Sequence, residues 1–243
     1  MEVSKRFGGV NALDRVSFSI AENQILGIIG LNGSGKTSAV NVITGFAKPD
    51  SGQIWFKGKE ITGFPPHRIA ALGIARSFQT VRPFHNLPAF KNLIVPLYSP
   101  RIRKFTESGR WGDRDAVALD LLEEVGFERD SYVPYKPASA LPHGYLRRLE
   151  LARCLALRPD LLITDELFSG LSTSEAGRQH VASHREASGE GMTVMMVEHR
   201  LRELFRLANK IVVMDRGRKI AEGSPGEIME NSAIKETYLG AEL

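Results

Sequence analysis

The segment GLNGSGKT at residues 30–37 most constrains how this chain can fold, because it places three glycines and a lysine directly behind an apolar run. That run, QILGII at 24–29, is short and continuous, as expected for a strand buried on both faces. Gly30, Gly35, Lys36 and Thr37 match the pattern G-x-x-x-x-G-K-[ST]. A loop of this kind folds back between strand and helix, so that its backbone N–H groups converge on phosphate oxygens. The segment therefore predicts a nucleotide-phosphate site on an α/β scaffold.

The residue types of this phosphate loop, residues 30–37, assign individual roles. We expect Lys36 to reach the β- and γ-phosphates and the Thr37 hydroxyl to bind Mg²⁺. The other residues expected around the phosphates are Gly30, Asn32, Gly33, Ser34, Gly35 and Ser38. The alternative is a glycine-rich turn with an incidental lysine, which the strand before it and the helix after it disfavour.

The rest of the chain alternates short apolar runs with helical patterns. The runs are continuous, which is typical of strands in a covered parallel sheet, and they lie at 24–29, 161–164, 192–197 and 211–214. Helical patterns lie between them, at 37–45, 146–157 and 174–188. This alternation predicts an α/β fold.

Other segments have a different pattern. Residues 13–20 and 52–61 alternate in hydrophobicity and carry turn residues, which predicts antiparallel strands flanking the phosphate loop. Residues 86–135 contain no convincing strand, whereas 115–127 has helical spacing. We therefore predict a single domain over 1–243, with an α/β core and antiparallel part at 1–82 and 155–243, and an inserted helical subdomain at 83–154.

Charge argues against nucleic acid as a partner. The 32 basic residues are interleaved with 28 acidic ones, and the formal net charge is only +4. The only local basic excess is RIRKF at 101–105, with Arg110 and Arg114 nearby. Because nucleic-acid binders gather basic residues into a face or stripe, we interpret this segment as a solvated loop. A contact with a phosphate or a lipid headgroup is the alternative.

Cysteine usage and hydropathy bear on the compartment. Cys154 is the single cysteine, so an internal disulfide is excluded, and its apolar surroundings LELARCLAL predict buried packing. The chain has no apolar run near the roughly 18 residues of a membrane span, and the start MEVSKRFGG has no signal-peptide core. We expect a cytoplasmic chain whose membrane role, if any, comes through a partner.

The segment LLITDE at 161–166 places two carboxylates at the end of a predicted buried strand. Asp165 is expected to bind Mg²⁺ directly or through its shell, and Glu166 to polarise an attacking water as general base. A pair of acidic residues after an apolar run is also a common helix cap. Combined with the phosphate loop upstream, the pair predicts nucleotide hydrolysis.

In order and spacing, these motifs and several others resemble the ATP-binding cassette ATPases over nearly the whole chain. Gln79, in ARSFQTVRPF, matches the glutamine that contacts Mg²⁺ and the attacking water. His199, in MMVEHRL, matches the histidine that contacts the γ-phosphate, and Phe7 matches the aromatic residue that stacks on adenine. Taken alone, the glutamine or histidine would be an ordinary hydrogen-bonding residue and Phe7 a core residue.

The resemblance implies a P-loop NTPase core of ATP-binding cassette type, with an antiparallel β subdomain and an inserted α-helical subdomain. It implies an ATPase that binds ATP and Mg²⁺. The implied catalytic residues are Lys36, Gln79, Glu166 and His199, and the implied magnesium ligands are Thr37, Gln79 and Asp165.

Residues 141–145, LPHGY, here called the signature segment, depart from the family's Leu-Ser-Gly-Gly-Gln. In the family this helix start meets the γ-phosphate held by the opposite subunit. Pro142 removes the serine hydroxyl, whereas Gly144 keeps a backbone amide for the same contact. Leu167 replaces the usual proline after the glutamate, and Ser172 replaces an aspartate. These departures raise the alternative of a nucleotide-binding regulatory subunit in a heterodimer.

Within the family, several stretches look similar to ATPase subunits of bacterial branched-chain amino acid importers, namely KRFGGVNAL, ITGF, IARSFQTVRPFHNLPAFKNL, RRLELARC and TYLGAEL. This resemblance implies a dimeric ATPase, peripheral on the inner face of the cell membrane, that powers import of branched-chain amino acids or a related small polar solute. The implied partners are membrane-spanning permease subunits and a second ATPase subunit. A soluble cassette ATPase without a transporter, for example in iron–sulfur cluster assembly, is the alternative.

Overall fold

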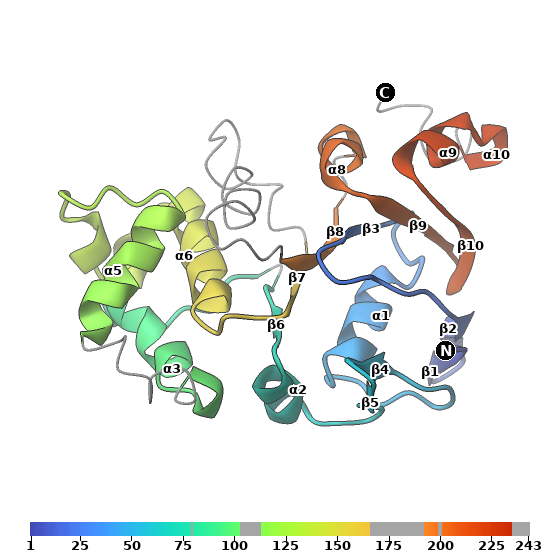
Figure 1. The fold of residues 1–243 in the computed structure, drawn as a ribbon, viewed down its shortest axis with the longest axis horizontal. Coiled ribbons are helices and arrows are strands. Elements are labelled where there is room, and N and C mark those ends of the chain that lie inside the picture. Colours follow the sequence, from blue (N-terminus) through green and yellow to red (C-terminus); the bar gives the residue numbers. More distant parts are fainter. Residues whose placement is uncertain (79, 103–112, 166–191, 199–200, 235–243) are drawn as a thin grey trace. The chain divides into compact units, whose positions relative to one another are not determined.

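The computed structural model describes residues 1–78, 80–102, 113–165, 192–198 and 201–234. The chain divides into two compact units, one formed by 1–70 with 193–243 and the other by 71–192 (Figure 1). The two units are described in turn. The predicted subdomain boundaries at 82/83 and 154/155 stay a prediction.

A twisted sheet forms the centre of the first unit. Its strands are β3 (Ile25–Ile29), β8 (Thr193–Val197), β9 (Lys210–Asp215) and β10 (Arg218–Gly223), in the order β10-β9-β3-β8. β8, β3 and β9 are parallel, and β10 runs antiparallel to β9. All residues of β3 and β8 are buried, so the continuous apolar runs predicted these strands correctly.

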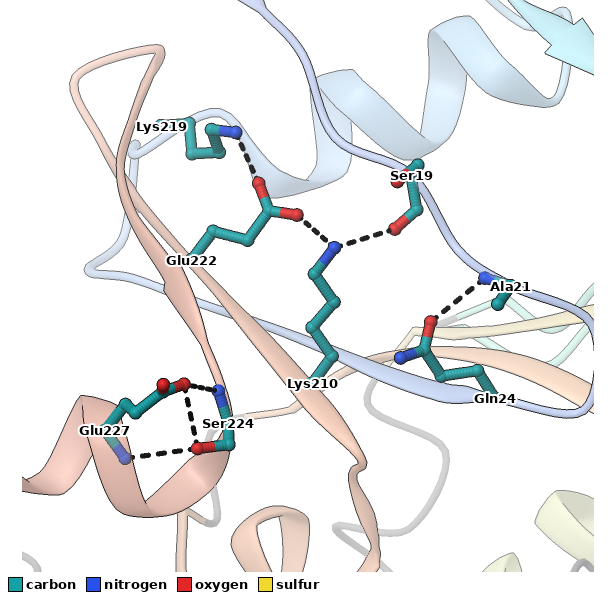
Figure 2. A network of polar contacts seen from close by, with 8 residues as sticks. All are labelled: Ser19, Ala21, Gln24, Lys210, Lys219, Glu222, Ser224 and Glu227. Atoms are coloured by element: carbon teal, nitrogen blue, oxygen red, sulfur yellow. Dashed lines mark hydrogen bonds and ion pairs between the residues drawn. The ribbon is translucent and has the colours of Figure 1, made fainter.

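β10 was missed, because its sequence RKIAEG mixes charged and small residues, and none of its residues is buried. The charged side chains of this edge form a network with β9. Glu222 is paired with both Lys219 and Lys210, and Lys210 also donates to the Ser19 carbonyl at 3.3 Å (Figure 2). Burial alone would raise the pKa of Glu222, but its interactions with the two lysines outweigh this effect and lower that pKa.

Ser224 and Glu227 form a capping box at the start of α9 (Pro225–Glu230) (Figure 2).

Short antiparallel pairs complete the strands of the first unit. β1 (Val3–Phe7) pairs with β2 (Val10–Val16), and β4 (Trp55–Phe56) pairs with β5 (Lys59–Glu60). The prediction of antiparallel strands is thus confirmed, but its bounds were wrong. β2 ends at Val16 instead of continuing to 20, and only four residues of 52–61 are paired in named strands.

Helices of the first unit include α1 (Lys36–Ile43), α8 (Leu201–Leu207) and α10 (Ser232–Ile234). α8 packs on β3. A β-carbon at Gly27 would lie 2.9 Å from Leu204 Cδ2 and 2.7 Å from Ile211 Cδ1, which explains a glycine inside a buried strand. α2 (Pro66–Leu72) carries the chain from the first unit into the second.

The described residues of the second unit form a parallel strand pair and a group of helices. β6 (Ile74–Arg76) pairs with β7 (Leu161–Asp165) in parallel register. Its described α-helices are α3 (Ile94–Leu97), α5 (Arg114–Glu124) and α6 (His143–Leu155), and its described 3₁₀ helices are η1 (Phe90–Leu93), η2 (Val133–Tyr135) and η3 (Ala138–Ala140). α5 packs against α6 and η1 (Figure 1), and Leu93, Leu122 and Leu149 are fully buried.

Two of the three helices predicted within this unit are present with shifted bounds. α5 starts early because Asp113 caps it, accepting from the N–H groups of Asp115 at 2.9 Å and Ala116 at 3.3 Å. α6 starts at His143 rather than 146, directly after Pro142 in the N-cap position. The predicted helix at 174–188 lies outside the described residues.

The first two residues of the basic segment at 101–105 do not form part of a solvated loop, whereas 103–105 lie outside the described residues. Arg101 pairs with Asp160 at 3.0 Å and donates to the carbonyls of Leu157 and Arg158, and Ile102 is buried.

Among the described helices, none is long and apolar enough to cross a membrane. Cys154 is buried, as its apolar surroundings predicted.

Candidate nucleotide site

The phosphate loop connects β3 to α1 through glycines with positive φ. Gly30, Gly33 and Gly35 have φ of 152°, 80° and 102°, a region that other residues rarely adopt. Gly35 is the N-cap of α1, and the Ser34 N–H donates to the Leu31 carbonyl at 3.1 Å. The glycine spacing seen in the sequence therefore has a backbone reason at each position.

The loop is held against neighbouring backbone on one side and is open on the other. A β-carbon at Gly30 would lie 2.2 Å from the Met214 carbonyl oxygen, and one at Gly35 would lie 2.5 Å from the Ala12 carbonyl oxygen. Gly217, in the turn between β9 and β10, donates its N–H to the Ser34 carbonyl at 2.9 Å. A β-carbon at Gly33 would meet no described atom within 4 Å. The loop is thus fixed between β2 and the β9–β10 turn, with Gly33 on its open side.

Lys36 is buried within the loop, with 6% of its surface exposed. Its Nζ donates to the carbonyls of Gly30 at 2.7 Å and Leu31 at 3.0 Å, and lies 3.5 Å from Ser34 Oγ. The ammonium is therefore folded over the loop, on a flexible stem that can turn toward a phosphate. Its contact with the β- and γ-phosphates stays a prediction.

The start of α1 suits an anion. None of the described side chains caps this helix, and its first turn holds no acidic residue. Its backbone N–H groups and positive dipole end are the features that bind phosphate. Thr37 and Asn32 are exposed and Ser38 is half-buried, so the Thr37 hydroxyl is accessible to a metal ion. These residues fit a nucleoside triphosphate with its Mg²⁺.

Phe7 ends β1 and is 49% exposed, so the interpretation as a core residue is wrong. The ammonium of Lys5 lies 5.3 Å from the centre of its ring. An exposed aromatic face in the same unit as the phosphate loop suits a base-stacking role, which stays a prediction.

Asp165 closes β7 in the second unit, and its carboxylate is buried. Arg76 Nη2, at the end of β6, lies 3.0 Å from Asp165 Oδ2, and the two side chains are 8% and 5% exposed. The Asp165 N–H also lies 3.3 Å from Ser77 Oγ. Burial lowers the pKa of Arg76, while the ion pair with Asp165 opposes that shift. Sequence reasoning missed Arg76, since a lone arginine after two apolar residues carries no specific signal.

The signature segment lies at the start of α6 in the second unit. Pro142 has φ −57° and ψ 153°, His143 is exposed, and a β-carbon at Gly144 would meet no described atom within 4 Å. The Tyr145 hydroxyl donates to both carboxylate oxygens of Glu128, at 2.7 and 2.9 Å. This bond lowers the pKa of Glu128 and raises that of Tyr145. The helix start is therefore tied to the segment after α5, a contact that the sequence did not reveal.

Other predicted residues cannot be placed. Gln79, Glu166 and His199 lie outside the described residues, as do Leu167 and Ser172. Of the proposed magnesium ligands, Thr37 belongs to the first unit and Asp165 to the second. The roles of all these residues stay predictions.

Comparison with known proteins identifies the family. The family model described as ABC transporter matches residues 13–169. The chain is 35% identical over 246 residues to the high-affinity branched-chain amino acid transport ATP-binding protein BraF of Pseudomonas aeruginosa, covering 98% of this chain and 95% of that protein. It is also 35% identical over 249 residues to a probable branched-chain amino acid transport ATP-binding protein, LivG, of Archaeoglobus fulgidus, covering 99% and 94%.

A solved structure agrees with these relatives. The ADP conformation of an ATP-binding cassette of an ABC transporter superposes with a TM-score of 0.78 and 30% identity, covering 98% of this chain and 96% of that one. The predicted fold class is thereby confirmed. With the family model covering most of the chain and the identity extending over nearly all of it, this chain belongs to the ABC transporter family, as one of its ATP-binding ATPase subunits.

Proposed function

We propose that this ATPase powers the import of branched-chain amino acids, or of a related small polar solute, through membrane permease partners. The observation that carries the nucleotide chemistry is the phosphate loop, with Lys36 folded over its carbonyls beside the uncapped start of α1. The relatives named above are transport proteins for branched-chain amino acids, which supports this class of substrate.

The proposed roles of the residues follow from the chemistry of phosphoryl transfer. Lys36 leaves the loop carbonyls to hold the β- and γ-phosphates, while the amides of Gly33 and Gly35 point toward them. Phe7 stacks on the adenine, a contact of about 1–3 kcal/mol. Glu166 takes a proton from the attacking water, which His199 helps to orient.

Thr37, Gln79 and Asp165 are the residues proposed to hold Mg²⁺. When bound, Mg²⁺ neutralises charge on the phosphate oxygens. Asp165 already lies in an ion pair with Arg76. Its carboxylate is thus held at a fixed position at the end of β7 before any metal ion is present.

We propose a head-to-tail dimer, in which the Gly144 amide of one subunit completes the nucleotide site of the other. The open space beside Gly144 and the exposed His143 leave this helix start accessible. The assembly would lie on the inner face of the cell membrane, bound to its permease subunits.

A regulatory subunit of a heterodimer is the second candidate, favoured by the lack of a hydroxyl at Pro142. Steady-state ATPase assays on this chain alone and mixed with a second cassette subunit separate the two. Equal activity per subunit in both assays would count against the regulatory function. A soluble ATPase without a transporter is disfavoured by the relatives, and its test is whether a permease co-purifies.

The experiment for the main proposal uses the chain purified from its native membrane with whatever proteins accompany it, reconstituted into vesicles. Uptake of labelled leucine should require internal ATP, and Glu166→Gln should abolish uptake while the complex still assembles. Recovery of the chain without any membrane protein would sink the import proposal.

A further inference from the structure

An ion pair on α6, with a buried carboxylate and a half-buried guanidinium, contacts the backbone on both sides of Gln79. Glu150 is only 4% exposed, and Arg153, one helical turn later, has its Nη1 3.0 Å from Glu150 Oε2. The Glu150 carboxylate also accepts a hydrogen bond from the backbone N–H of Phe78. The acidic partner therefore reaches from the signature helix to the residue just before Gln79.

Arg153 makes the second contact with the same segment. Its Nη1 donates to the Arg82 carbonyl at 2.9 Å, and its guanidinium lies 5.5 Å from the centre of the Phe84 ring. Together the two side chains hold the backbone at positions 78 and 82, on both sides of Gln79. All these residues belong to the second unit.

The cost of burying the Glu150 carboxylate argues for a positioning role. Burial raises the pKa of Glu150, and the ion pair with Arg153 and the Phe78 amide oppose that shift only in part. Buried ion pairs contribute little net stability compared with apolar residues of similar volume. Fixed geometry is what such a pair supplies, since each charge is satisfied in one arrangement only.

We propose that Glu150 and Arg153 are positioning residues that join the segment 78–82 to α6, so that this segment and the helix move as one body during turnover. This inference rests on the proposed role of Gln79 in hydrolysis. It links two parts of the ATPase within one subunit, since the signature segment begins the same helix that carries the pair. Neither residue needs to touch the nucleotide.

The test compares Glu150→Ala and Glu150→Gln with the wild type, in the complex with its permeases. Glu150→Ala should speed amide exchange in a peptide covering 76–84 by about tenfold, as expected for loss of a hydrogen bond to a charged group. It should lower kcat by a similar factor and leave the KM for ATP unchanged, because the phosphate loop belongs to the other unit. Glu150→Gln keeps an oxygen acceptor for the Phe78 amide and should recover most of the loss.

Glu123→Gln provides a matched control, because Glu123 also pairs with an arginine in this unit but on the surface, 3.0 Å from Arg129. Glu123→Gln should change neither the rate of amide exchange in the 76–84 peptide nor kcat. The inference would be overturned if Glu150→Ala left the rate of amide exchange in the 76–84 peptide unchanged. It would also be overturned if Glu150→Ala lowered the melting temperature but kept the wild-type kcat per folded molecule. If the wild type itself hydrolyses no ATP, the proposed function fails, and the exchange result still decides whether the pair holds the segment.

Discussion

Replacing Tyr145 by phenylalanine tests whether the altered signature segment is held in place by the hydrogen bond from Tyr145 to Glu128. The substitution removes only the hydroxyl that donates to Glu128 and keeps the edge-on contact of the ring with Phe127, whose centroid lies 5.0 Å away. A hydrogen bond to a charged group contributes about 1.5–3 kcal/mol when buried. Glu128 is exposed, so solvent screening reduces the expected loss to about 0.5–1 kcal/mol.

The pH dependence of this loss has a definite sign. The pKa of Glu128 is lowered in the folded state, so its contribution is present above the ordinary value of about 4.3 and is lost as the pH falls through the folded pKa. The pKa of Tyr145 is raised, so its contribution is present below about 10 and is lost at higher pH. The difference between wild type and variant should therefore be largest between these two values.

Urea unfolding at pH 7 and pH 3 measures the effect, and Tyr132→Phe is the matched control because Tyr132 is 84% exposed. A double-mutant cycle with Glu128→Gln isolates the pair. The reasoning is refuted if Tyr145→Phe and Tyr132→Phe lower stability equally, or if the cycle shows no coupling.

Further predictions concern the loop, the ion pair and the thiol. Gly35→Ala should destabilise the chain by more than about 1–3 kcal/mol, because the positive φ is combined with a carbonyl oxygen 2.5 Å from the new β-carbon. Gly33→Ala should cost only the backbone strain of its positive φ. The melting temperatures of the two variants test this difference. Arg76→Met should cost about 3–5 kcal/mol by leaving the buried Asp165 carboxylate without its guanidinium, and urea unfolding should show part of this recovered in Arg76→Met with Asp165→Asn. Burial raises the pKa of the Cys154 thiol, so a thiol reagent should modify it only at the rate of unfolding.

The sequence predicted the phosphate loop and the buried strands because both depend on local patterns. Continuous apolar runs identify β3, β7, β8 and β9, and the glycine spacing requires the positive φ found at Gly30, Gly33 and Gly35. These features need no knowledge of distant contacts.

The missed features depend on contacts between residues far apart in the chain. Gly217 looks like an ordinary turn glycine, yet its N–H holds the Ser34 carbonyl. Arg76 and Asp165 form an ion pair because β6 and β7 are paired. Tyr145 donates its hydrogen bond to Glu128 because α5 packs on α6. A single sequence contains no record of such pairings.

Equilibrium binding of MgATP together with steady-state turnover tests the central claim, that the phosphate loop holds ATP for hydrolysis by this chain. The account predicts that Lys36→Ala weakens ATP binding by at least about tenfold, since a charge-assisted contact with phosphate is lost. Glu166→Gln should bind ATP at least as well as the wild type and turn over little. Wild-type affinity in Lys36→Ala, or wild-type turnover in Glu166→Gln, would contradict it.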